Sequence, residues 1–150
     1  MGSAIEAWIE YDDASWYEPG RAAELPFSSY CDNCIPVDWF IHFSTAKDYR
    51  FFSAIAGMRS QQGDPVPLFP LRGSLPPNVS AQTRKAVLEI IGEDNPYLSW
   101  LSYPEIEEAL THMGITREKI QLSTNLVLDF MQSIERRLGV GRSRLIFYID

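Results

Sequence analysis

A stiff, proline-rich stretch near the middle of the chain limits the fold more than any other feature of this sequence. Residues 59–79 contain five prolines and two glycines. Each proline fixes its own φ and lacks the backbone N–H that a helix interior or a central strand needs. We therefore expect a rigid, irregular loop over 59–79, with the regular elements on either side of it.

Two strand patterns stand on the N-terminal side of this loop. Residues 4–11 alternate in polarity, so Ile9 and Glu10 are expected on opposite faces of a half-buried strand. Residues 37–43 are rich in β-branched and aromatic side chains and predict a second strand. The stretch between them, 12–36, is acidic and rich in turn-forming residues, and it predicts a long irregular excursion.

Four segments carry the apolar spacing of amphipathic helices. They cover about 46–57, 81–92, 103–112 and 117–138. Ser102 and Glu105 have the spacing of a capping box at the start of the third of these helices. Residues 144–149 then predict a closing strand.

This order of elements predicts one α+β domain over residues 1–150. We expect a small antiparallel or mixed sheet, built from the N-terminal strands and the C-terminal strand, with about four helices packed on one face. A chain of 150 residues, of which 45% are hydrophobic, is long and apolar enough to bury one ordinary core.

The net charge of −7 is concentrated near the N-terminus. Residues 1–40 hold eight acids and a single base, whereas residues 41–150 hold twelve of each. Such a chain repels phosphate, so we expect no binding to duplex nucleic acid. The acidic segment predicts a solvated edge, or alternatively a surface for a basic protein or a cation. With no long apolar run and no secretory-signal pattern, we expect no membrane contact and a cytoplasmic location.

Cys31 and Cys34 form a C-x-x-C pair that fits three interpretations. They are ordinary thiols in a turn, half of a zinc site, or a redox pair. A zinc site lacks its second pair of ligands, because neither His42 nor His112 has a recognisable partner spacing. A redox pair normally opens a helix, whereas Pro36 and a strand follow here. We expect no metal and no cofactor.

Arginines on stiff backbone form the leading candidate for a binding site. The predicted ligand-binding residues are Arg59, Arg72, Gly73, Ser80, Tyr49 and Trp100. Guanidinium forks and the free N–H groups of a helix N-terminus both bind anions, and an aromatic side chain can stack on a base. If Arg59, Arg72 and Ser80 converge, they predict a site for a small anionic ligand. The alternative is structural, with both arginines tying down the loop through carbonyls and carboxylates.

Other charged groups have simpler structural interpretations. Glu105 and Glu108 share a helix face, as a catalytic carboxylate pair would, but first-turn acids also stabilise a helix by about 0.3–1 kcal/mol. Arg142 and Arg144 predict a strand edge protected by charge. The sequence has no nucleophile elbow, phosphate-binding loop or dinucleotide fingerprint, which favours a non-enzymatic protein.

Four motifs occur along the chain in a fixed order. They are D-Y-R-F-F-S-A-I-A-G-M-R at 48–59, R-G-S-L-P-P-N-V-S at 72–80, S-W-L-S at 99–102 leading into Glu105, and R-L-I-F-Y-I-D at 144–150. Together they resemble the hallmark segments of an uncharacterised family of small phage- and prophage-encoded proteins. That family often has a His before S-W-L, where this chain has Tyr97 and Leu98. The resemblance implies an accessory gene acting in the cytoplasm of an infected bacterium.

The leading functional hypothesis is a non-enzymatic phage accessory protein that binds a host component during infection. In its most specific form, the ligand is an anionic nucleotide used as an immune signal. One alternative is a protein-interaction module that grips a basic host protein with residues 1–40 and their tryptophans, Trp8, Trp16 and Trp39. Another is a small metal-dependent hydrolase using the cysteine pair and His42. Exposed strand edges also make a homodimer an option.

Overall fold

The computed structural model describes most of the chain after residue 48 and two short N-terminal segments. The described residues are 5–11, 34–36, 49–57, 63, 65–77, 79–92 and 95–149. The predicted strand over 37–43 lies outside them, as do Cys31, His42, Arg59 and the acidic excursion apart from its last three residues.

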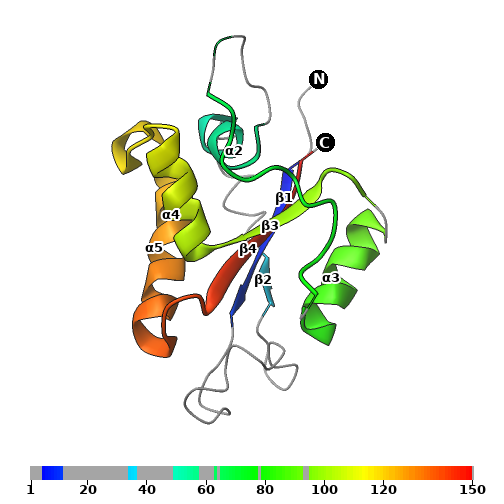
Figure 1. The fold of residues 1–150 in the computed structure, drawn as a ribbon. Helices are drawn as coiled ribbons and strands as arrows, with labels where there is room; N and C mark the ends of the chain where they lie inside the picture. Colours follow the sequence, from blue (N-terminus) through cyan, green and yellow to red (C-terminus); the bar gives the residue numbers. More distant parts are fainter. Residues whose placement is uncertain are drawn as a thin grey trace.

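The described part of the chain contains strands, helices and one 3-10 turn (Figure 1). They are β1 (Ile5–Tyr11), β2 (Cys34–Pro36), α2 (Tyr49–Ala56), α3 (Ala81–Ile91), β3 (Leu98–Ser102), α4 (Tyr103–His112), the 3-10 turn η2 (Arg117–Lys119), α5 (Leu122–Leu138) and β4 (Ser143–Ile149). The strands form one sheet in the order β2-β1-β4-β3, and every neighbouring pair is antiparallel. The predicted α+β class, antiparallel sheet and four helices are confirmed.

Helices cover both faces of this sheet. Leu145 and Phe147 of β4 belong to the larger core cluster, which α2, α4 and α5 complete. Ile146 points the other way and packs with Trp8 against Val87 of α3. Figure 1 shows α4 and α5 on one side of the strands and α3 on the other. The prediction that the helices pack on one face is therefore right for α2, α4 and α5 and wrong for α3. α3 covers the second face because β4 is apolar on both sides.

Three elements differ from the sequence-based expectation. β2 (Cys34–Pro36) occupies the end of the stretch 12–36, which was expected to be irregular. β3 was not predicted, because its five residues, LSWLS, do not alternate strictly between polar and apolar side chains and lie directly beside the capping-box pattern. The helix expected over 117–138 is interrupted, since η2 ends at Lys119 and α5 starts at Leu122. Ile120 has extended backbone between them, and its side chain is buried in the larger core.

The centre of the sheet holds a buried ion pair between Glu10 and Arg144. The two residues face each other in the β1–β4 register, and their exposed fractions are 0% and 5%. Arg144 Nε donates to Glu10 Oε1 at 2.7 Å, and a second guanidinium nitrogen binds the same oxygen. The predictions of a solvated acid at Glu10 and a charge-protected edge at Arg144 are both wrong, because β4 is a central strand.

Candidate functional site

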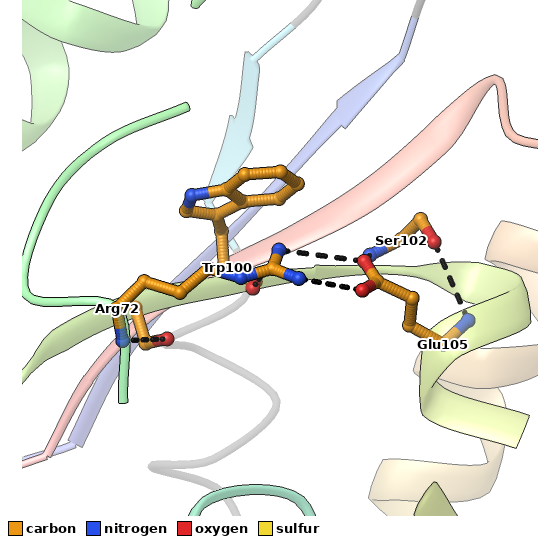
Figure 2. Close-up of polar contacts among 5 residues, drawn as sticks. Arg72, Trp100, Ser102 and Glu105 are labelled. Atoms are coloured by element: carbon orange, nitrogen blue, oxygen red, sulfur yellow. Dashed lines mark hydrogen bonds and ion pairs between the residues drawn. The ribbon is translucent and has the colours of Figure 1, made fainter. Parts of the chain in front are cut away.

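Arg72 is held by the protein's own groups (Figure 2). Its guanidinium faces the Glu105 carboxylate, with Nη2 2.5 Å from Oε2 and Nη1 3.4 Å from Oε1. Nη1 also donates to the carbonyl oxygen of Trp100 at 2.9 Å. The guanidinium carbon lies 3.8 Å from the centroid of the Trp100 ring, as a cation–π contact requires. The stacking predicted for Trp100 is therefore occupied by Arg72 in this structure.

The backbone of the proline-rich loop runs along the outer edge of β3. Gly73 N–H donates to the Leu98 carbonyl at 2.8 Å, and Arg72 N–H donates to Ser99 Oγ at 3.0 Å. Gly73 has φ +69°, a conformation that glycine adopts without steric cost. The loop thus satisfies backbone acceptors that an edge strand would otherwise present to another chain. We call this set of contacts the Arg72 clamp: Arg72, Gly73, Trp100 and Glu105.

Glu105 both pairs with Arg72 and caps the start of α4. Its carboxylate accepts from Arg72 and from the Ser102 N–H at 3.0 Å, and the Ser102 side chain accepts from the Glu105 N–H, which confirms the predicted capping box. Burial by itself would raise the pKa of Glu105. The hydrogen bonds from Arg72 and Ser102 outweigh burial and hold the pKa below its ordinary value of 4.5.

Acid should therefore release the clamp. Because the pKa of Glu105 is lower in the folded than in the unfolded chain, its stabilisation is complete above 4.5 and is lost as pH falls through the folded value. We expect Glu105→Gln to be less stable than the wild type at pH about 7, and the difference to shrink as pH falls below 4.5. Urea denaturation followed by circular dichroism measures this difference. Glu108→Gln, an exposed change on the same helix, is the control, and a pH-independent gap would contradict the assignment.

Ser80 lies at an anion site whose anion is Glu10. The Ser80 N–H and hydroxyl donate to Glu10 Oε2 at 3.2 and 2.9 Å, on the carboxylate whose other oxygen binds Arg144. Ser80 Oγ also accepts from the N–H of Thr83, so Ser80 caps α3 as predicted. A guanidinium and a helix N-terminus do converge on one anion here, but that anion belongs to the protein.

The remaining predicted binding residues give less information. Arg59 lies outside the described residues, and Tyr49 is described only through its backbone at the start of α2. Trp8, which we predicted to grip a host protein, is 3% exposed beneath α3 and so cannot reach a partner. Among the described residues, no group of three His, Cys, Asp or Glu is placed to hold a metal.

A cavity that sequence reasoning missed lies between α4 and the segment leading into α5. It has a volume of about 320 Å³. Ile106, Leu110 and Leu128 give it apolar walls, while Tyr103, Glu107 and Arg117 supply polar groups. The signal was present, because Tyr103, Glu107 and Leu110 recur at the spacing of one helix face. The sequence predicts an amphipathic helix here, with Glu105 and Glu108 as a possible carboxylate pair, and no binding residue at Tyr103 or Glu107.

Tyr103 is the unusual residue of this cavity. Its side chain is 5% exposed, and its buried hydroxyl has no hydrogen-bond partner in the described part of the chain. Burial raises the pKa of Tyr103 from 10.0 to about 12, and the neighbouring Glu107 carboxylate adds to the rise. The hydroxyl therefore stays protonated at neutral pH. Buried polar groups are nearly always paired, so an unpaired one calls for an explanation.

Glu107 and Arg117 differ in how far they are already engaged. Arg117 donates to the side chain of Asn125 at 2.5 Å and to its carbonyl at 2.9 Å, and it forms an ion pair with Asp129. Glu107 is exposed, and its carboxylate interacts with the Tyr103 hydroxyl, but it forms no ion pair with any residue that the structure describes. The carboxylate at the cavity therefore has no cationic partner, whereas the guanidinium is paired with Asp129.

An apolar ridge follows the outer face of α5. Leu122, Leu126 and Phe130 are four residues apart, and their exposed fractions are 74%, 48% and 45%. Side chains with this spacing lie on one helix face. The ridge is a surface on which a partner could dock, whereas the acidic segment predicted for that role lies mostly outside the described residues.

Comparisons with protein-family models, curated proteins and solved structures find no match for this chain. The resemblance to a phage family is therefore a hypothesis that depends on the four sequence motifs alone. No described helix is both long and apolar enough to cross a membrane.

Proposed function

We propose that this protein is a non-enzymatic binding protein that holds a small ligand in the cavity beside Tyr103. One observation carries the proposal, namely the buried hydroxyl of Tyr103 with no partner among the described residues. An unsatisfied buried group costs about 1–3 kcal/mol, and a ligand that bonds to it would remove that cost. A volume of about 320 Å³ is within the range of small-molecule sites.

The chemistry of Tyr103 supports binding over catalysis. A phenol with a pKa of about 12 is neither a nucleophile nor a base at neutral pH, but it remains able to donate and accept a hydrogen bond. Apolar walls around one such group are typical of sites that recognise a ligand without transforming it.

The setting of this proposal follows the sequence motifs. As an accessory protein of a phage, the chain would bind a host component in the cytoplasm of an infected bacterium. An anionic nucleotide at Arg72 and Ser80 is the weaker form of the proposal. Such a ligand would have to displace Glu105 from one residue and Glu10 from the other. The cavity needs no displacement, so it is the better-supported site.

A fragment titration tests the proposal. We expect small aromatic fragments to shift the backbone amide signals of Tyr103, residues 105–111 and residues 115–117 in ¹H–¹⁵N spectra, with dissociation constants of about 1 mM or tighter. Without ligand, Tyr103→Phe should raise the free energy of unfolding by about 1 kcal/mol, because it deletes the unpaired hydroxyl. Tyr97→Phe is the matched control, since Tyr97 is 45% exposed and lies away from the cavity lining.

Two results would remove the proposal. One is that no fragment shifts those amides. The other is that Tyr103→Phe destabilises the protein more than Tyr97→Phe does, which would show that the hydroxyl has a stabilising partner.

A further inference from the structure

The polar groups of the cavity indicate which kind of ligand head it accepts. Tyr103 and Glu107 are one turn apart on α4, so their side chains share the face that lines the cavity. Tyr103 is buried and Glu107 is exposed, which places the hydroxyl deep and the carboxylate near solvent. A ligand entering from solvent would meet a charged acceptor and then a neutral hydroxyl.

The charge balance at the cavity favours a donor over an anion. Arg117 is the cationic residue of the lining. Its Nε donates to the Asn125 side chain, and its Nη2 donates to the Asn125 carbonyl and to the Asp129 carboxylate, which balances its charge. Glu107 faces the neutral Tyr103 hydroxyl and forms no ion pair with a cationic side chain among the described residues. An anionic head would therefore approach an uncompensated carboxylate, whereas a cationic or donor-rich head would neutralise it.

The remaining lining residues determine the polarity of the part of the ligand that lies inside the cavity. Ile106, Leu110, Ile115 and Leu128 present aliphatic surface and no charged atoms. Burying an apolar group against such surface is favourable by about 25 cal/mol per Å². The body should be apolar and the polarity confined to one end.

We infer that the cavity takes a small amphipathic amine, whose apolar body packs between α4 and α5 and whose donor head binds the Glu107 carboxylate and the Tyr103 hydroxyl. This inference rests on the proposed function, since it names the ligand class for the same site. It replaces the anionic ligand that the sequence suggested with one of opposite charge.

Three probes of similar size separate the alternatives: benzylamine, benzyl alcohol and benzoate. Each is titrated into the full chain and followed by calorimetry and by the amide signals of Tyr103 and residues 105–111. We expect benzylamine to bind about tenfold more tightly than benzoate, because attraction to Glu107 is replaced by repulsion. Glu107→Gln should weaken benzylamine about fivefold and leave benzyl alcohol unchanged. Glu108→Gln removes the same charge from an exposed neighbour outside the lining and should change neither.

Each other outcome overturns a defined part of the scheme. If the three probes bind equally at the cavity, the proposed binding function stands and the amine inference falls. If benzoate binds most tightly, the ligand is an anion held by Arg117 and the inference is wrong. If Glu108→Gln weakens benzylamine as much as Glu107→Gln does, the preference is general charge attraction and no contact to Glu107 exists. If no probe binds, the proposed function fails together with the inference.

Discussion

Replacing Glu10 by alanine is expected to lower the free energy of unfolding by about 3–5 kcal/mol. The change leaves the Arg144 guanidinium, 5% exposed, without its carboxylate at the centre of the sheet. It also removes the acceptor of the Ser80 N–H and hydroxyl at the start of α3. Since a domain of this size has about 5–15 kcal/mol of total stability, the variant should be close to unfolding at room temperature.

Arg144→Ala should cost somewhat less than Glu10→Ala. The Glu10 carboxylate would keep its two hydrogen bonds from Ser80, so its charge remains partly solvated by the helix N-terminus. Urea denaturation of both single variants measures the two losses. Equal stability of the wild type and Glu10→Ala would show that the pair is not buried in solution.

A double variant separates charge from shape. Glu10→Leu combined with Arg144→Met removes both charges and keeps most of the buried volume, so it should recover most of the loss seen in either single change. Comparing this double variant with the sum of the Glu10→Leu and Arg144→Met single variants gives the coupling energy of the pair. A coupling near zero would mean that the two side chains act independently, contrary to their facing register.

This ion pair also shows why local patterns predicted the helices better than the sheet. The helix expected over 81–92 is found at Ala81–Ile91, and the capping box at Ser102 is present, because caps and apolar spacing involve neighbouring residues. Glu10 and Arg144 are separated by 134 positions. Within the alternating strand β1, Glu10 has the pattern of a solvated residue, and only the strand order reveals its buried partner.

The same limit applies to the candidate site. The prolines around Arg72 predicted a stiff loop. The partner of Arg72, Glu105, is 33 positions away in the sequence. Because the capping box already accounted for Glu105, nothing in the sequence pointed to a second role for it. Tyr103 shows a second limit of prediction from sequence, because its hydroxyl is unpaired only when no hydrogen-bonding group from the rest of the fold lies next to it. No pattern of neighbouring residues encodes such a gap.

The second large effect is expected at the Arg72 clamp. Arg72→Ala should lower the free energy of unfolding by about 2–3 kcal/mol, the value of a partly buried, charge-assisted hydrogen-bond pair. The side chains of Arg72 and Glu105 are 27% and 23% exposed, so solvent screens the pair only in part. Arg72→Lys should restore less than half, because an ammonium can neither bind the carboxylate in a fork nor stack flat on Trp100.

Loss of the clamp should also expose the β3 edge. With the loop loosened, the carbonyls of Leu98 and Trp100 lose their donors from Gly73 and Arg72 and become available to a strand of another molecule. At equal protein concentration, we expect sedimentation velocity to show more self-association for Arg72→Ala than for the wild type. Arg136→Ala, an exposed change on α5, is the matched control and should stay within about 0.5 kcal/mol of the wild type.

The clamp experiment also decides between the structural and the ligand-binding roles of Arg72. If the Arg72 guanidinium holds the loop in place, the stability losses of Glu105→Gln and Arg72→Ala should be non-additive, because each substitution breaks the same contact. If Arg72→Ala is as stable as Arg136→Ala and instead abolishes calorimetric binding of an anionic nucleotide, the pair with Glu105 opens readily. The residue would then belong to an anion site, as its place in a rigid loop first suggested. Stability lost without any change in ligand binding assigns Arg72 to the fold.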